Sequence, residues 1–175
     1  SSGKSTFINA LIGEELMPSA ADPTTAKIFK IQSLPKGTWM DTEIRFQYQG
    51  ENATICFQSG AYELKKYKSL PDLKLKYFLD RELSNIQFGQ EYICQTLTAL
   101  NKFDESDAIS DQIEIQTPFY YSSLPLDEYQ FIIYDTPGSN ANSHKDHFEI
   151  LKKALSRQTN GLPIFLTSRE QMDTD

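Results

Sequence analysis

The first residues of the chain constrain its fold more than any other feature. The segment Gly3-Lys4-Ser5-Thr6 leads directly into apolar residues at helical spacing, namely Phe7, Ile8, Ala10, Leu11 and Ile12. In the motif G-x-x-x-x-G-K-[ST], amides at a helix N-terminus cradle phosphate oxygens, the lysine reaches the β- and γ-phosphates, and the hydroxyl holds magnesium. The sequence therefore predicts a phosphate-binding loop centred on Lys4 and Ser5. The first glycine of the motif would precede Ser1, so we expect the chain to begin inside a domain.

A second motif places a carboxylate at the end of a predicted strand. Residues 129–134 have the pattern of a buried strand and end in Asp135-Thr136-Pro137-Gly138. Ligands bind at the carboxyl ends of strands in open α/β sheets. Asp135 can therefore reach magnesium through a water, while the amide of Gly138 can face the γ-phosphate and move when that group leaves. Because proline and glycine also favour ordinary turns, this motif gains its weight from Lys4 and Ser5.

A polar loop after the first helix delivers Thr24 and Thr25 to the start of an extended segment at 26–33. Such a loop can fold over a nucleotide and offer a threonine hydroxyl to the metal and the attacking water. Local sequence alone favours a simpler interpretation, in which two β-branched residues open a strand.

Composition excludes several classes of function. The net charge is -7 and lysines and arginines form no groove-like cluster, so nucleic acid is not a predicted partner. Cys56 and Cys94 lack C-x-x-C spacing, which predicts free thiols in a reducing compartment. No apolar run approaches the roughly 20 residues that cross a bilayer, so we expect the visible chain to be soluble. His144 and His147 make a weak candidate metal site, and solvated surface histidines are the simpler interpretation.

The middle of the chain predicts an added lobe. The pattern predicts a β-hairpin of residues 43–49 and 53–57 around a turn at 50–52. Residues 61–103 have helical periodicity, which Pro71 and Gly89 divide into two or three helices. The lysines of this stretch are best explained as a solvated face. A strand at 111–119 should pair antiparallel with the strand that ends at Asp135, because their connection is short. A helix at 147–155 and a buried strand at 162–166 follow.

Together these elements predict one α/β domain with a P-loop NTPase fold. We expect a three-layer α/β/α sandwich whose mixed sheet has an antiparallel edge strand, with a β-hairpin plus helical insertion at about 36–110. The whole chain, 1–175, is then part of one such domain, and 175 residues suffice for one core.

Four segments also carry a family resemblance: Ser1-Ser2-Gly3-Lys4-Ser5-Thr6-Phe7-Ile8-Asn9-Ala10-Leu11-Ile12-Gly13, Leu16-Met17-Pro18, Pro23-Thr24-Thr25-Ala26 and Asp135-Thr136-Pro137-Gly138. With them the chain resembles the GTPase domain of bacterial dynamin-like proteins. The resemblance is continuous over the first 26 residues and returns from about 129 to 167. A long insertion between the threonine loop and the aspartate motif is itself typical of that family.

The resemblance implies a role for each matching residue. Ser2 and Gly3 belong to the nucleotide-binding loop, Lys4 contacts the β- and γ-phosphates, Ser5 binds Mg²⁺ and Thr6 bonds the α-phosphate. Thr25, rather than Thr24, positions the attacking water and contributes to the metal site. Asp135 lies on the metal side and Gly138 senses the γ-phosphate. Ser1 helps to hold a monovalent cation, K⁺ or Na⁺, where other GTPases receive an arginine finger.

The sequence departs from the pattern of other GTPases at two points. Position 139 holds Ser139 where Ras-like GTPases have a water-orienting glutamine, although dynamin-like proteins also lack that glutamine. The guanine-reading motif Thr/Asn-Lys-x-Asp is absent, because Asn101-Lys102-Phe103-Asp104 precedes Asp135 and lies on a predicted helix, so we interpret it as a coincidence. The base is therefore inferred from the family.

We expect a GTPase that binds GTP and GDP, self-associates through its nucleotide face, and contacts membrane through regions outside this chain. The expected location is cytoplasmic or peripheral at the inner face of the cell membrane. Two alternatives stay open at this point. One is an ATP-hydrolysing P-loop protein, because phosphate chemistry does not choose the base, and the other is a nucleotide-binding scaffold without turnover.

Overall fold

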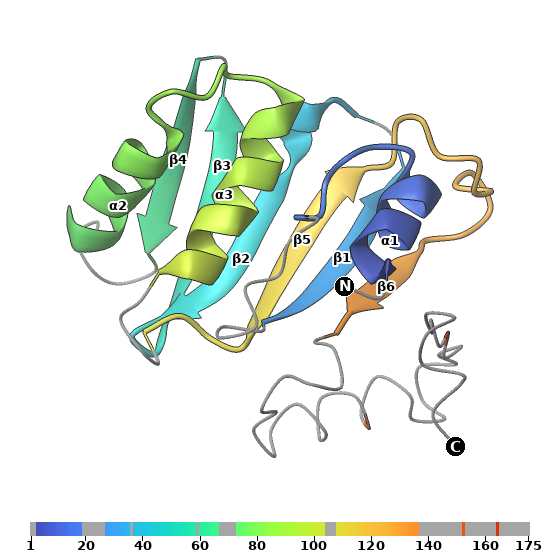
Figure 1. The fold of residues 1–175 in the computed structure, drawn as a ribbon. Helices are drawn as coiled ribbons and strands as arrows, with labels where there is room; N and C mark the ends of the chain where they lie inside the picture. The colour runs from blue at the N-terminus through green and yellow to red at the C-terminus, as the bar shows by residue number, and fades with distance from the viewer. Residues whose placement is uncertain are drawn as a thin grey trace, which may run out of the picture.

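The computed structural model describes residues 3–18, 27–35, 37–58, 60–66, 73–103 and 108–136, together with Lys152 and Ile164. A single six-stranded sheet runs through these residues, with the strand order β4-β3-β2-β5-β1-β6 (Figure 1). The strands are β1 (Ile28–Leu34), β2 (Glu43–Tyr48), β3 (Glu51–Gln58), β4 (Ala61–Lys66), β5 (Gln112–Pro118) and β6 (Ile132–Asp135).

The sheet is mixed. β1 and β5 pair in parallel, whereas β1 with β6, β2 with β5, β2 with β3 and β3 with β4 pair antiparallel. β4 and β6 therefore form the two ends of the described sheet, and both run antiparallel to their neighbours. The predicted α/β class with a mixed sheet is confirmed in this form.

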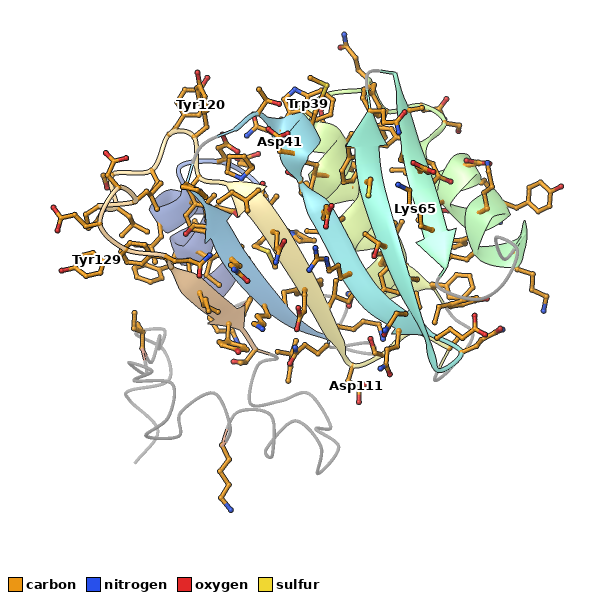
Figure 2. The ribbon with its side chains drawn as sticks, turned by 180° about the vertical axis from the view of Figure 1, so that it is seen from behind. Trp39, Asp41, Lys65, Asp111, Tyr120 and Tyr129 are labelled. Atoms are coloured by element: carbon orange, nitrogen blue, oxygen red, sulfur yellow. The ribbon has the colours of Figure 1, made fainter. Side chains whose placement is uncertain are left out.

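Three α-helices and one short 3-10 helix accompany these strands within the described residues: α1 (Lys4–Ile12), α2 (Leu73–Leu83), α3 (Gln90–Lys102) and η1 (Trp39–Asp41). All three α-helices cover one face of the sheet, with α1 over the β1 and β6 end and α2 and α3 over the inserted strands (Figure 1). Seen from behind, the strands lie in front and the helices behind them (Figure 2). The described ranges thus contain one helical layer of the predicted three-layer sandwich.

The core lies between the sheet and this helical layer because the strands alternate in polarity. Ile44 and Phe46 of β2 are buried, as is Ile55 of β3. Along each strand, buried residues alternate with less buried residues that face away from the helices. α3 buries Leu97 and Leu100 completely, and each such side chain contributes about 1.5–3 kcal/mol relative to exposure. The insertion therefore shares one hydrophobic core with the rest of the sheet.

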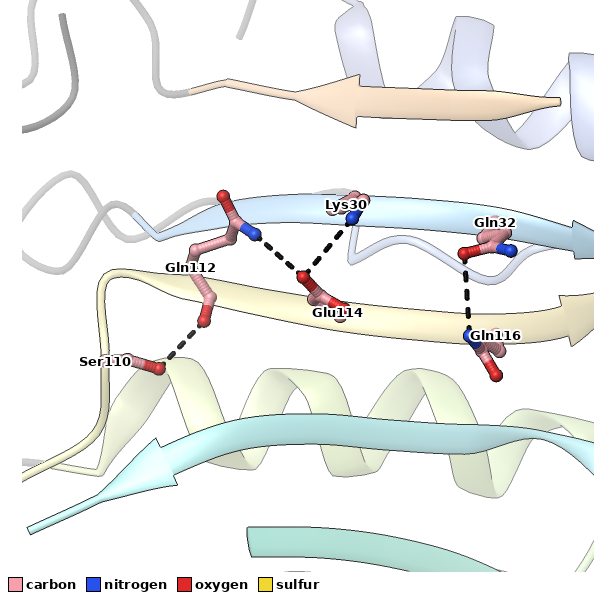
Figure 3. A network of polar contacts seen from close by, with 6 residues as sticks. All are labelled: Lys30, Gln32, Ser110, Gln112, Glu114 and Gln116. Carbon is pink, nitrogen blue, oxygen red and sulfur yellow. Dashed lines mark hydrogen bonds and ion pairs between the residues drawn. The ribbon is translucent and has the colours of Figure 1, made fainter. Parts of the chain in front are cut away.

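The opposite face of the sheet is polar across its central strands. Glu114 of β5 accepts from Lys30 Nζ at 3.3 Å and from Gln112 Nε2 at 3.2 Å, and Gln116 Nε2 donates to Gln32 at 3.5 Å (Figure 3). The bonds from Lys30 to Glu114 and from Gln116 to Gln32 join the parallel strands β1 and β5. The inserted strands carry further ion pairs on this face, each within one strand: Arg45 with Glu43 in β2 and Lys65 with Glu63 in β4.

The hairpin prediction is confirmed, with a shift of its turn. β2 and β3 pair in register from Tyr48 with Glu51 to Glu43 with Cys56. Gln49 and Gly50 form the two-residue turn with φ of 51° and 78°. Positive φ at both central positions is the geometry that matches the twist of a hairpin. Glu51 and Asn52, predicted as part of the turn, are the first two residues of β3 instead.

The predicted helical stretch at 61–103 is wrong over its first residues. Ala61–Lys66 is strand β4, which pairs with β3 from Gln58 with Ala61 to Ala53 with Lys66. Tyr62 and Leu64 have a spacing of two, which fits a strand, and Gly60 makes the preceding turn at φ 82°. The prediction of two or three helices in this stretch is confirmed for the described residues after β4, which form two helices, α2 and α3.

The predicted antiparallel pairing of β5 with β6 is also wrong, because β1 lies between them. The connection at 119–131 passes to the far side of β1, where the backbone of Phe131 exchanges two hydrogen bonds of 2.9 Å with Ser33. β6 begins at Ile132, so Tyr129 precedes the strand and is 61% exposed rather than buried. Apart from Lys152 and Ile164, the predicted elements at 147–155 and 162–166 lie outside the described residues.

Candidate functional site

The first turn of α1 presents the residues that the sequence predicts to bind phosphate. Gly3 stands immediately before the helix with φ of 71°, a left-handed conformation that favours glycine, and its carbonyl accepts from Phe7 N at 2.9 Å. Ile8 and Ile12 are buried and hold the helix against the core. The first turn carries no acidic side chain, so its amides and the positive end of the helix dipole are available to an anion.

β6 brings Asp135 to that helix end. The Ser5 hydroxyl donates to Asp135 Oδ2 at 3.3 Å, and Lys4 Nζ donates to the carbonyl of Thr136 at 2.8 Å. α1 packs against β6, and Asp135 is the last residue of that strand. The two motifs that the sequence singled out, far apart along the chain, therefore meet at one point.

Asp135 is buried, and its environment favours a nearby cation. Burial raises the pKa of its carboxyl group above the usual 3.8. The positive charge of Lys4 and the hydrogen bond from Ser5 act against this rise in pKa, as does the backbone of Thr136. The negative charge of a desolvated carboxylate is unfavourable, and a divalent cation bound beside it would stabilise that charge.

The donor set fits magnesium. Ser5 and Asp135 supply hard oxygen ligands that lie 3.3 Å apart, and magnesium commonly takes one or two protein oxygens and completes its shell with waters and phosphates. Among the described residues, no group of three or more histidine, cysteine or acidic side chains could hold a metal by itself. The candidate His144 and His147 pair lies outside those residues.

Several predicted site residues also lie outside the described residues. These are Ser1, Ser2, Thr24, Thr25 and Gly138, so their predicted roles stay predictions. Thr6 follows Ser5 in the first turn of α1 and is exposed. The structure thus places Gly3, Lys4, Ser5, Thr6 and Asp135 around one helix end.

The segment Asn101-Lys102-Phe103 closes α3 and serves the packing of the insertion. The ring of Phe103 makes edge contacts with Tyr48 and Phe78, with centroids 6.0 and 5.1 Å apart. A base-reading loop would follow a core strand rather than end a helix of the inserted lobe. This placement agrees with the interpretation of that motif as a coincidence.

Sequence reasoning missed how α1 ends. Asn9 binds the following loop through its side chain, and the carbonyl of Leu11 accepts from the Ser122 hydroxyl at 2.5 Å. Gly13, with φ of 85°, lies so close to the backbone of Tyr121 that a Cβ there would come within 2.4 Å of it. A polar Asn9 inside an apolar helical pattern was the only signal of this junction.

Comparisons with known proteins agree with this geometry. A family model described as the dynamin family matches residues 1–174, a range that includes both motifs of the site. Dynamin-like protein A of Bacillus subtilis (strain 168) is 29% identical over 170 residues, and the match covers 86% of this chain and 14% of that protein. The chain therefore spans a small part of that relative's length. Within the described residues, no helix combines the length and apolar character needed to cross a membrane.

Proposed function

The chain belongs to the dynamin family of GTPases, and we propose that it binds GTP with magnesium and hydrolyses the γ-phosphate by attack of water. One observation carries this proposal, namely the contact of Ser5 with Asp135 beside Lys4 at the start of α1. A phosphate-binding lysine, a metal-binding hydroxyl and a strand-end carboxylate are the parts that P-loop phosphoryl transfer requires in one place.

In the proposed mechanism the helix end binds and orients the triphosphate. The amides of Ser2 and Gly3 cradle phosphate oxygens, Lys4 neutralises charge on the β- and γ-phosphates, and Thr6 bonds the α-phosphate. Bound magnesium would be held by Ser5 and by Asp135, the latter through a water, and would neutralise charge that develops between the β- and γ-phosphates.

Three further residues complete the proposal. Thr25 orients the attacking water and adds its oxygen to the metal site, and Gly138 senses the γ-phosphate through its amide. Ser1 helps to hold K⁺ or Na⁺, whose charge replaces that of an arginine finger. These assignments rest on the match of this sequence to the family motifs.

We also propose that two copies associate through the nucleotide face and that this association orders Thr25 and the segment after Gly138. The parent protein would then couple nucleotide turnover to membrane remodelling at the inner face of the cytoplasmic membrane. The support is family membership, since the relative's printed name identifies a dynamin-like protein.

Phosphate release by the full-length protein tests the proposal. Lys4→Ala removes the only ammonium that the described site offers, and we expect loss of magnesium-dependent GTP hydrolysis by about 10²-fold or more. Lys65→Ala is the matched control, because Lys65 lies on the polar face of β4 and pairs with Glu63. Unchanged turnover in Lys4→Ala, with Lys65→Ala also active, would overturn the assignment of the phosphate site.

Two additional measurements separate the alternatives. Competition between labelled GTP and excess ATP distinguishes a GTPase from an ATP-hydrolysing protein. We expect labelled GTP to stay bound to the protein in the presence of excess ATP. A rate per molecule that rises with protein concentration supports activation by self-association. Tight GTP binding without phosphate release at every concentration and with magnesium present would support a scaffold instead.

A further inference from the structure

We infer that Asn9 is a positioning residue for GTP hydrolysis, because its side chain fixes the start of the threonine loop to the phosphate-binding helix. This inference rests on the proposed function. It concerns a residue that lies on α1 one helical turn after Ser5, and whose side-chain hydrogen bonds go to Leu16 and Met17.

Both ends of the Asn9 amide group bind the chain that follows α1. Its Oδ1 accepts from Leu16 N at 3.1 Å and from Met17 N at 2.7 Å, while its Nδ2 donates to the carbonyl of Met17 at 3.0 Å. Its backbone carbonyl also accepts from Gly13 N at 2.8 Å and from Glu14 N at 3.1 Å. Asn9 thus accepts hydrogen bonds from four backbone N–H groups after α1 and donates one to a backbone carbonyl.

The chemistry of the site selects an asparagine. Leu16 and Met17 are buried, so their amides and the Met17 carbonyl need partners inside the protein. An asparagine side chain accepts and donates from the same short group, whereas an ionised aspartate only accepts and an alanine does neither. Apolar packing of Leu16 and Met17 would keep them in the core, but the directional bonds to Asn9 set where the backbone lies relative to α1.

The connection to catalysis follows from the order of the chain. α1 carries Lys4 and Ser5 at its beginning, and the segment that leaves Met17 and Pro18 leads to Thr24 and Thr25. Asn9 therefore ties the start of the water-positioning segment to the helix that binds the phosphates. A displacement of about 1 Å between reacting groups can cost about 10²-fold in rate, while ground-state binding changes far less.

Two variants of the full-length protein test the inference. In Asn9→Ala we expect kcat for GTP to fall by about 10²-fold, while the dissociation constant for a fluorescent GDP analogue stays within about threefold of the wild-type value. Asn9→Asp keeps the two accepted bonds and places a carboxylate against the Met17 carbonyl, so a fall of about tenfold in kcat is expected, again with nucleotide affinity retained.

Thr42→Val is the control for lost stability. It breaks a buried hydroxyl pair with Thr117, which lies at the opposite end of the strands from Asp135. Its kcat should equal that of the wild type at temperatures where both are folded, so a general loss of stability is separated from misplacement of the threonine loop.

The possible outcomes are distinct. Wild-type kcat in Asn9→Asp overturns the inference even if Asn9→Ala fails to fold, and so does a parallel loss of nucleotide affinity and kcat, which would assign Asn9 to the integrity of the phosphate site. If Lys4→Ala is inactive in the same assay, the proposed function stands while the role of Asn9 falls. If Lys4→Ala is active, the proposed function itself fails.

Discussion

Replacing Gly13 by alanine is expected to destabilise the protein far more than the same change at Gly50. Both glycines adopt a left-handed backbone, with φ of 85° at Gly13 and 78° at Gly50. A Cβ at Gly50 would meet no atom within 4 Å, whereas at Gly13 it would lie 2.4 Å from the carbonyl carbon and oxygen of Tyr121. The pair therefore separates backbone strain from steric overlap.

The magnitude follows from those two effects. An alanine in the left-handed region costs about 1–2 kcal/mol, and this cost is common to both variants. Overlap that forces a packed backbone to move costs about 1–3 kcal/mol more. The overlapping atoms at Gly13 belong to a main chain that is also tied by Ser122 to the carbonyl of Leu11, so the contact cannot be relieved by rotating a side chain. We expect losses of about 2–5 kcal/mol for Gly13→Ala and about 1–2 kcal/mol for Gly50→Ala.

Urea unfolding followed by the emission of Trp39 measures both values. Trp39 is the one tryptophan of this chain, and its ring lies 5.0 Å from that of Phe88, so its environment changes when the core opens. The reasoning is refuted if Gly13→Ala loses no more stability than Gly50→Ala. That result would mean that the end of α1 and the connection at 119–131 are not in close contact.

Two further predictions concern buried polar groups. Because burial raises the pKa of Asp135 above 3.8, the folded protein holds this proton more tightly than the unfolded chain, and stability falls as pH rises from the unfolded pKa through the folded one. Asp135→Asn should therefore unfold at higher urea than the wild type at neutral pH and lose magnesium-dependent turnover; greater stability of the wild type would contradict this. Thr42→Val should cost about 1–3 kcal/mol, because it leaves the buried Thr117 hydroxyl without the 2.8 Å bond, and Thr42→Val with Thr117→Val should recover part of that loss in a double-mutant cycle. Additive losses would show that the pair contributes no coupling.

The sequence predicted the central part of the candidate site because its signals are local. Gly3, Lys4 and Ser5 stand in one motif before an amphipathic helix, and Asp135 ends a run with strand propensity. A helix N-terminus and the carboxyl end of a strand are places where α/β proteins bind ligands, so the meeting of the two motifs could be expected. Their separate roles toward a nucleotide stay predictions.

The errors concern long-range contacts that no local pattern encodes. A six-residue segment such as 61–66, in which Tyr62 and Leu64 alternate with charged side chains, fits a helix and a strand nearly equally well, and pairing with β3 decided between them. The strand order is a similar case. Nothing in the local sequence of β5 and β6 shows that each pairs with β1, which separates them. Asn9 was missed because its partners, Leu16 and Met17, are recognisable only once the loop has folded back.

From β4 to β1 each strand pairs with the next, in the order β4-β3-β2-β5-β1, and this arrangement has a mechanical consequence. A pull across the outermost strand would peel its backbone bonds one at a time, whereas a pull along that strand must break all of them together. The inserted lobe therefore resists tension parallel to β4 much more strongly than tension perpendicular to it. The same ladder of backbone bonds connects β4 to β1, whose residues Phe29–Gln32 pair with the segment that ends at Asp135.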